Sequence, residues 1–68
     1  MASEDLKKLG EKLRQKREAA NLTQASVARA ANMHINYYAR IERGEVNPSF
    51  EKLQSLKKVL KIKSLDLL

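Results

Sequence analysis

The sequence contains no cysteine, only one histidine and no long run of apolar residues. Without cysteine, neither a disulfide framework nor a thiolate metal site can form. One histidine, His34, cannot supply the roughly four ligands of a zinc site, so we expect no metal and no other cofactor. No apolar run approaches the roughly 20 residues of a membrane helix, and no hydrophobic stretch follows a basic start. We therefore expect no membrane segment and no signal peptide, with the cytoplasm as the default location.

Residue groupings typical of catalysis are also absent. The chain has no glycine-rich phosphate loop, and its carboxylates lie in first turns of expected helices or beside basic residues. We expect no enzymatic activity and no small-molecule substrate.

What the chain does have is basic charge. Its 68 residues carry 14 Lys and Arg against 8 Asp and Glu, a net charge of +6, and this length suits one domain spanning residues 1–68. A positive excess favours a polyanionic partner such as nucleic acid, although a solvated basic surface would have the same composition. The excess is spread over both halves of the chain, so it permits nucleic-acid binding without locating it.

The residue pattern predicts an all-α protein. β-Branched residues are scarce, no long run alternates apolar with polar, and Ser3, Thr23 and Ser49 are well placed to cap helices. Gly10 costs helix stability but can allow a close helix approach, Asn32 suits a left-handed turn, and Gly44 can end a helix. We expect helices from Ser3 to about Ala20, over Gln24–Ala31 and Ile35–Arg43 and after Ser49, with a last turn at Leu65–Leu68.

Apolar side chains recur at helical spacing and define the expected core. Met33 and Tyr38 should also turn inward, because each follows the apolar spacing of its segment. The inner faces are expected to hold Leu6, Leu9 and Leu13 in the first helix, Val27, Ala28 and Ala31 in the second, and Phe50, Leu53, Leu56, Val59 and Leu60 in the fourth.

Several separated motifs, taken in register, resemble a known family. They are Leu22-Thr23-Gln24, Arg40-Ile41-Glu42-Arg43-Gly44, Asn47-Pro48-Ser49 and the closing Leu65-Asp66-Leu67-Leu68. With this spacing the chain resembles the Cro/repressor-type helix-turn-helix domains, the XRE or lambda-repressor-like family. The resemblance implies a compact five-helix domain, with the helix-turn-helix at about 23–43, that binds DNA as a dimer on a palindromic operator.

The chain departs from the family pattern at four positions in and beside the helix-turn-helix. Asn32 stands where the turn glycine is common, and His34 replaces the usual Ser or Thr cap of the third helix. Ser26 occupies a position that is often acidic, and Tyr38 one that is usually aliphatic.

Three residues of the third helix are the candidates for reading bases. The first turn of this helix is expected to enter the major groove, where Ile35 can touch a thymine methyl and Asn36 can pair with adenine. Arg40 lies one turn further on the same face and can take guanine in a fork geometry. The alternatives are that Ile35 is a core residue, that Asn36 only helps to start the helix, and that Arg40 contacts phosphate.

Four further residues are candidates for phosphate contacts. Gln24 opens the second helix, and the resemblance makes it a phosphate-contacting and orienting residue, although it could be an ordinary polar residue of a first turn. Tyr37 lies on the outer side, where its hydroxyl suits a phosphate oxygen. Arg43 and Asn47 flank the loop after the third helix, which family geometry puts against phosphates; the alternative is a solvated turn.

The resemblance also implies structural roles. Arg17 and Glu42 resemble the family's internal ion pair between the first and third helices, unless both are simply solvated. Leu65, Leu67 and Leu68, together with Val46, could form a dimer surface, although some of them must belong to the core of so small a domain.

The sequence therefore predicts a sequence-specific regulator of transcription that binds a double-stranded DNA operator as a homodimer, with its third helix in the major groove. It would work in the cytoplasm, at the nucleoid. The alternative is a protein-interaction module, an antitoxin-like or adaptor domain with the same fold. DNA binding should weaken steeply with added salt, whereas apolar contacts with a protein should respond weakly.

Overall fold

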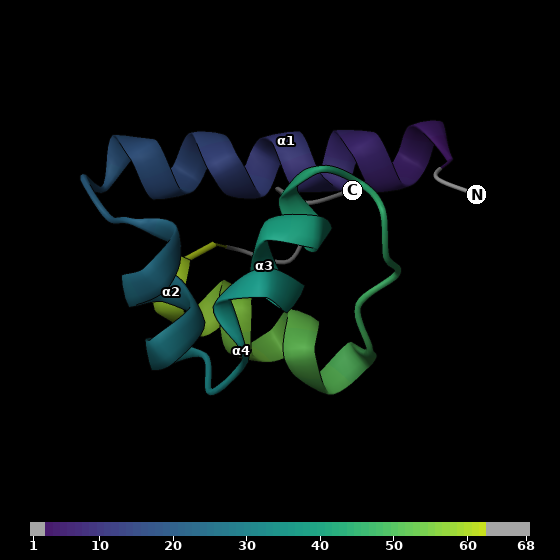
Figure 1. Ribbon diagram of the computed structural model, residues 1–68. Coiled ribbons are helices and arrows are strands. Elements are labelled where there is room, and N and C mark those ends of the chain that lie inside the picture. Colours follow the sequence, from purple (N-terminus) through teal and green to yellow (C-terminus); the bar gives the residue numbers. More distant parts are fainter. Residues whose placement is uncertain (1–2, 63–68) are drawn as a thin grey trace.

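The computed structural model describes residues 3–62, which form four helices and no strand. The helix α1 (Glu4–Ala19) runs along one side of the molecule, and the three shorter helices lie beneath it (Figure 1). These are α2 (Gln24–Ala30), α3 (Ile35–Glu42) and α4 (Phe50–Leu60). The all-helical prediction is confirmed, but the described part contains four helices rather than five, and the expected turn Leu65–Leu68 lies outside it.

Each helix begins at a side chain that accepts a backbone N–H, as the sequence predicts for three of them. The Ser3 hydroxyl accepts from Leu6 N at 3.1 Å, and the Ser49 hydroxyl accepts from Lys52 N at 3.2 Å. At α2 the exchange is reciprocal: Ser26 N donates to Thr23 Oγ1, and Thr23 N donates to Ser26 Oγ, both at 3.0 Å. Ser26 thus completes a capping box in place of an acidic residue, since its hydroxyl reaches the same backbone donor.

All four helices end in one way, with a residue in the left-handed region just past the last turn. These residues are Asn21, Asn32, Gly44 and Lys61, with φ of 59°, 57°, 75° and 55°. After each, the next N–H bonds back five residues, as in Leu22 N to Arg17 O at 3.0 Å and Glu45 N to Arg40 O at 2.9 Å. This pairing satisfies the last carbonyls and turns the chain sharply. Asn32 and Gly44 therefore act as the sequence predicts.

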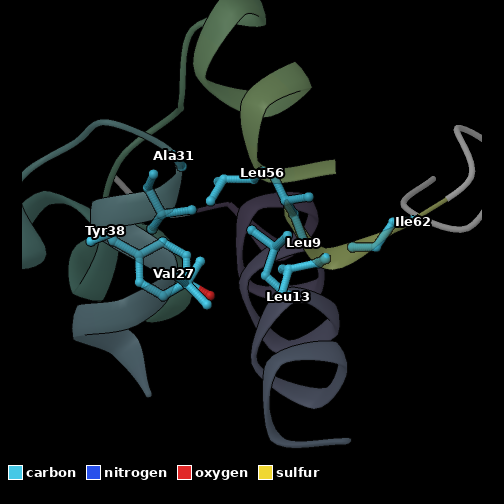
Figure 2. Close-up of a cluster of buried hydrophobic side chains, with 10 residues drawn as sticks. Leu9, Leu13, Val27, Ala31, Tyr38, Leu56 and Ile62 are labelled. Carbon is cyan, nitrogen blue, oxygen red and sulfur yellow. The ribbon is translucent and has the colours of Figure 1, made fainter. Parts of the chain in front are cut away.

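The core lies between the four helices and takes side chains from each (Figure 2). Its largest fully buried side chains are Tyr38, Leu13, Ile41, Leu56 and Val27. Tyr38 is buried as predicted, and Met33 is partly buried against the same cluster.

The expectation that Phe50 belongs to the inner face of α4 is wrong. Its side chain is 74% exposed. Phe50 is the first residue of α4, more than a turn before Leu56, and the buried residues of this helix are Leu56 and Leu60. The apolar spacing extends to the first residue of α4, but the packing of α4 against the other helices does not reach that residue.

Gly10 lies where α1 crosses the end of α3. A β-carbon at this position would collide with the backbone carbonyl oxygens of Ile41 and Glu42. Glycine is therefore required here by the close approach of two backbones, which fixes where α3 ends relative to α1.

Candidate nucleic-acid interface

The helix α3 has two distinct faces. Tyr38, Ile41 and Glu42 are buried on one face, where they meet the other helices. Asn36 is exposed on the other face, and the Arg40 side chain, one turn further along, keeps 53% of its surface. Ile35 lies about two turns before Glu42, on the same side of the helix, but as the first residue of α3 it still keeps 41% of its surface. All three candidate base-reading residues are therefore accessible, and Ile35 is not a core residue.

The start of α3 is fixed by contacts from both sides of the turn. The imidazole Nδ1 of His34 accepts the backbone N–H of Asn36 at 3.1 Å, so histidine serves as the cap in place of Ser or Thr. Lys52 of α4 donates from Nζ to the carbonyl oxygen of Asn32 at 3.2 Å. Together these contacts orient the first turn of α3, where Ile35 and Asn36 lie.

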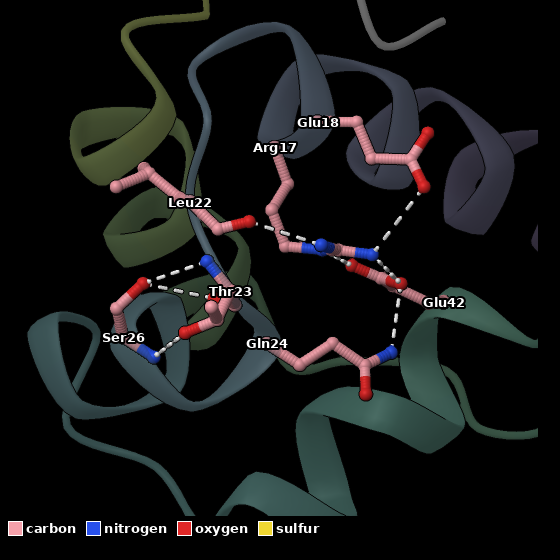
Figure 3. A network of polar contacts seen from close by, with 7 residues as sticks. All are labelled: Arg17, Glu18, Leu22, Thr23, Gln24, Ser26 and Glu42. Atoms are coloured by element: carbon pink, nitrogen blue, oxygen red, sulfur yellow. Dashed lines mark hydrogen bonds and ion pairs between the residues drawn. The ribbon is translucent and has the colours of Figure 1, made fainter.

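The end of α3 is held by a polar cluster inside the molecule (Figure 3). Arg17 Nε donates to Glu42 Oε2 at 2.7 Å and Arg17 Nη2 to Glu42 Oε1 at 3.2 Å, which is a two-point contact between α1 and α3. Arg17 Nη1 also donates to the carbonyl oxygen of Leu22 at 3.0 Å, and Gln24 Nε2 donates to Glu42 Oε1 at 2.9 Å. One carboxylate therefore connects α1, α2 and α3.

The cluster is buried enough to change the ionisation of its members. Burial alone would raise the pKa of Glu42, but hydrogen bonds from Arg17 and Gln24 outweigh it, so the pKa lies below its usual value. The hydrogen bond with Glu42 in turn raises the pKa of Arg17. Burial, together with the nearby Glu42 carboxylate, raises the pKa of Tyr38. The enclosed Tyr38 hydroxyl lies close enough to influence Glu42 but makes no hydrogen bond of good geometry within residues 3–62. Glu42 is therefore a fixed negative charge at neutral pH.

The remaining candidate residues differ in how far they are exposed. Arg43 and Asn47 are exposed in the segment after α3, and Gln24 is half-buried at the start of α2. Tyr37 is half-buried and packs against the core, so only part of its side chain is accessible. Val46, a candidate for the dimer surface, is also half-buried against the core, and Leu65, Leu67 and Leu68 lie outside the described residues.

The sequence did not predict the contact of Lys52 with the Asn32 carbonyl or the contacts of Glu45 with two arginines. The Glu45 carboxylate accepts from Arg43 Nε at 2.9 Å and Nη2 at 3.2 Å, and it lies 3.6 Å from Arg40 Nε. The position of Glu45 directly after Gly44 is a signal for this contact, because a glycine end folds the following residue back towards the helix.

Other kinds of site receive no support from residues 3–62. Within this range no three His, Cys, Asp or Glu side chains gather in a way that could hold a metal ion. None of the four helices is both long and apolar enough to cross a bilayer.

Comparison with known proteins finds relatives with the same fold. HTH-type transcriptional regulator DdrOP3 of Deinococcus deserti is 43% identical over 61 residues, which are 90% of this chain and 47% of that protein. The chain thus spans about half the length of this relative. The crystal structure of the restriction-modification controller protein C.AhdI from Aeromonas hydrophila matches with a TM-score of 0.92 and 32% identity, over 97% of this chain and 100% of that one. A family model described as helix-turn-helix matches residues 13–68, and the chain belongs to this helix-turn-helix family.

Proposed function

We propose that this protein is a sequence-specific regulator of transcription that binds double-stranded DNA with α3 in the major groove. The observation that carries the proposal is the division of α3 into a clamped inner face and an exposed outer face. Glu42 and Tyr38 hold the helix, while Ile35, Asn36 and Arg40 remain accessible. A short helix presented in this way suits the depth and width of the major groove.

In this proposal the exposed residues divide into two groups. Ile35, Asn36 and Arg40 read base edges, through a thymine methyl, an adenine and a guanine respectively. Phosphates are contacted by Arg43 and Asn47, which are exposed, and by Gln24 and Tyr37, which are partly accessible. Phosphate contacts set affinity and register, whereas base contacts set sequence preference. No catalytic step is part of this function, and its place is the cytoplasm, at the nucleoid.

The protein binds a palindromic operator as a homodimer. One copy of α3 offers three base-reading side chains, and each good base contact discriminates by roughly 1–3 kcal/mol. Three contacts are too few to distinguish one operator from the very many competing sites of a genome. A second copy doubles the number of bases read and places the two α3 helices about 34 Å apart on one face of the duplex.

A selection from random duplexes with the full chain tests the proposal. We expect enrichment of two inverted half-sites whose centres are separated by one helical turn, and affinity for the enriched duplex that falls steeply with added salt. If no sequence is enriched, or if the salt dependence is weak, the proposal is wrong. A weak dependence together with binding to another protein would instead support the interaction module.

A further inference from the structure

The end of α3 differs from the other three helix ends. At each end, the residue after the left-handed position folds back onto the last turn. In α1, α2 and α4 this residue is apolar, and Leu22, Met33 and Ile62 each pack on or within the core. At α3 it is Glu45, an exposed carboxylate. An apolar contact with the last turn is usual at this position, so a charged residue here needs another explanation.

At α3 the turn brings a charged side chain, Glu45, to the position that an apolar side chain occupies at the other helix ends. It lies beside Arg40, the same residue of the last turn whose carbonyl accepts its backbone N–H at 2.9 Å. Its Oε1 is 3.6 Å from Arg40 Nε, and both of its oxygens accept from Arg43 at 2.9 and 3.2 Å. The backbone turn at Gly44 therefore fixes a carboxylate between two arginines of the proposed DNA surface.

The contact with Arg40 engages one nitrogen of the guanidinium. A carboxylate at Nε leaves the edge formed by Nη1 and Nη2, which matches O6 and N7 of guanine. Hydrogen bonds from Arg43 lower the pKa of Glu45, so the carboxylate is charged at neutral pH and stands beside Arg40 as a counter-charge. A long side chain held in this way loses less freedom when it meets a base than one that is free to rotate.

We propose that Glu45 is a positioning residue that sets sequence preference: it holds Arg40 so that the free edge of the guanidinium meets guanine. The inference rests on the proposed function, because it assigns Glu45 a role only if Arg40 reads a base. It also predicts opposite effects on two kinds of DNA. Removing a negative charge beside phosphates raises affinity for any duplex, whereas loosening Arg40 lowers the preference for one base pair.

The test compares Glu45→Gln with Glu51→Gln in the full chain. Glu51 is another exposed carboxylate, in the first turn of α4, so this control removes the same charge without touching the two arginines. The Arg40→Ala variant first identifies, by selection from random duplexes, the base pair whose preference depends on Arg40. Binding is then measured on the selected duplex, on the duplex changed at that base pair, and on unrelated DNA.

For Glu45→Gln we expect the preference at the Arg40-dependent base pair to fall about three- to tenfold, a part of the discrimination of a full guanine contact. Affinity for unrelated DNA should rise about two- to threefold in both variants, because both lose one repelling charge. Glu45→Asp should restore part of the preference, and Glu45→Gln should have no effect on preference when Arg40 is already alanine. A change that is purely structural would not be confined to one base pair.

Each failure has a distinct meaning. If Glu45→Gln keeps the wild-type preference, or loses it equally with Glu51→Gln, the inference is wrong while the proposed function stands. If Arg40→Ala changes no base preference, both the inference and the assignment of Arg40 are wrong. If the wild-type chain enriches no duplex at all, the proposed function itself fails and the inference falls with it.

Discussion

Asn36 is exposed in the first turn of α3, beside a cap that fixes the direction of this turn. If its amide pairs with adenine, Asn36→Ala should lower the preference at one base pair of each half-site by roughly 1–3 kcal/mol. Affinity for unrelated DNA should stay nearly constant, because that affinity comes from phosphate contacts. Selection from random duplexes, followed by binding measurements on single-base variants, would measure both quantities.

Asn47 offers a matched control for this prediction, since it allows the same substitution in an exposed loop proposed to meet phosphates. Asn47→Ala should weaken binding to all duplexes alike. A loss of preference at one base pair in the Asn47 variant, or unchanged preference in the Asn36 variant, would contradict the assignment of roles.

Among the helices, the contact between α1 and α3 depends on one missing side chain. Gly10→Ala adds a better helix former, worth about 1 kcal/mol in an open helix. Its β-carbon would collide with carbonyl oxygens of α3, and relief requires movement of the backbone. We therefore expect the free energy of unfolding in urea to fall by about 1–3 kcal/mol, as in other overpacked sites. Gln15→Ala, on the exposed side of α1, should change the free energy of unfolding by less than about 0.5 kcal/mol. If the Gly10 variant is as stable as the wild type, α1 and α3 can move apart without cost.

The end of α4 makes the opposite prediction. Lys61 has φ of 55°, a conformation in which a β-carbon is crowded and glycine is not. Lys61→Gly should raise the free energy of unfolding by about 0.5–1 kcal/mol, because the relief of strain exceeds the added freedom of the unfolded chain. Lys58→Gly, inside the same helix, should lower it by about 1 kcal/mol. Destabilisation by both glycines in thermal or urea unfolding would mean that Lys61 is not strained.

These elements show which features the sequence reveals. Caps such as Ser3 and Thr23, the turn at Asn32 and the stop at Gly44 are predictable because each acts within one turn of the chain. The left-handed conformation of Lys61 is not predictable, because lysine has no local preference for this region. Lys61 adopts it as the next residue, Ile62, packs into the core. Phe50 fails for a related reason, since apolar spacing does not say where the neighbouring helices end.

The candidate site is predictable to a similar extent. The exposure of Asn36 and Arg40 follows from helical spacing, because their opposite face carries the apolar residues. The contact between Arg17 and Glu42 joins residues far apart in the chain, and only the family resemblance pointed to it. The place of Glu45 directly after the glycine stop is a local signal that it folds back, although the spacing does not say which side chains it meets. The contact between Lys52 and the Asn32 carbonyl joins two distant parts of the chain and has no signal in the spacing.

The molecule as a whole is joined by the charged group of Glu42, which is bound by Arg17 of α1 and Gln24 of α2. Its pKa is lower in the folded protein than the usual 4.5. The charged form therefore favours folding, and this contribution is complete above about pH 4.5 and is lost as the pH falls through the lower folded-state pKa. We expect the free energy of unfolding, measured in urea from pH 7 to pH 2, to decrease steadily below about pH 4.5.

Two variants separate Glu42 from the other carboxylates. Glu42→Gln leaves Arg17 buried without its counter-charge, so the protein should lose about 3 kcal/mol at pH 7 and show a smaller further loss on acidification. Glu45→Gln should retain the wild-type dependence: the pKa of Glu45 is also lowered, but its pair is exposed to solvent, and exposed pairs contribute little to stability. If both variants lose stability at low pH as the wild type does, other carboxylates cause the acid sensitivity, and the buried pair does not hold the three helices together.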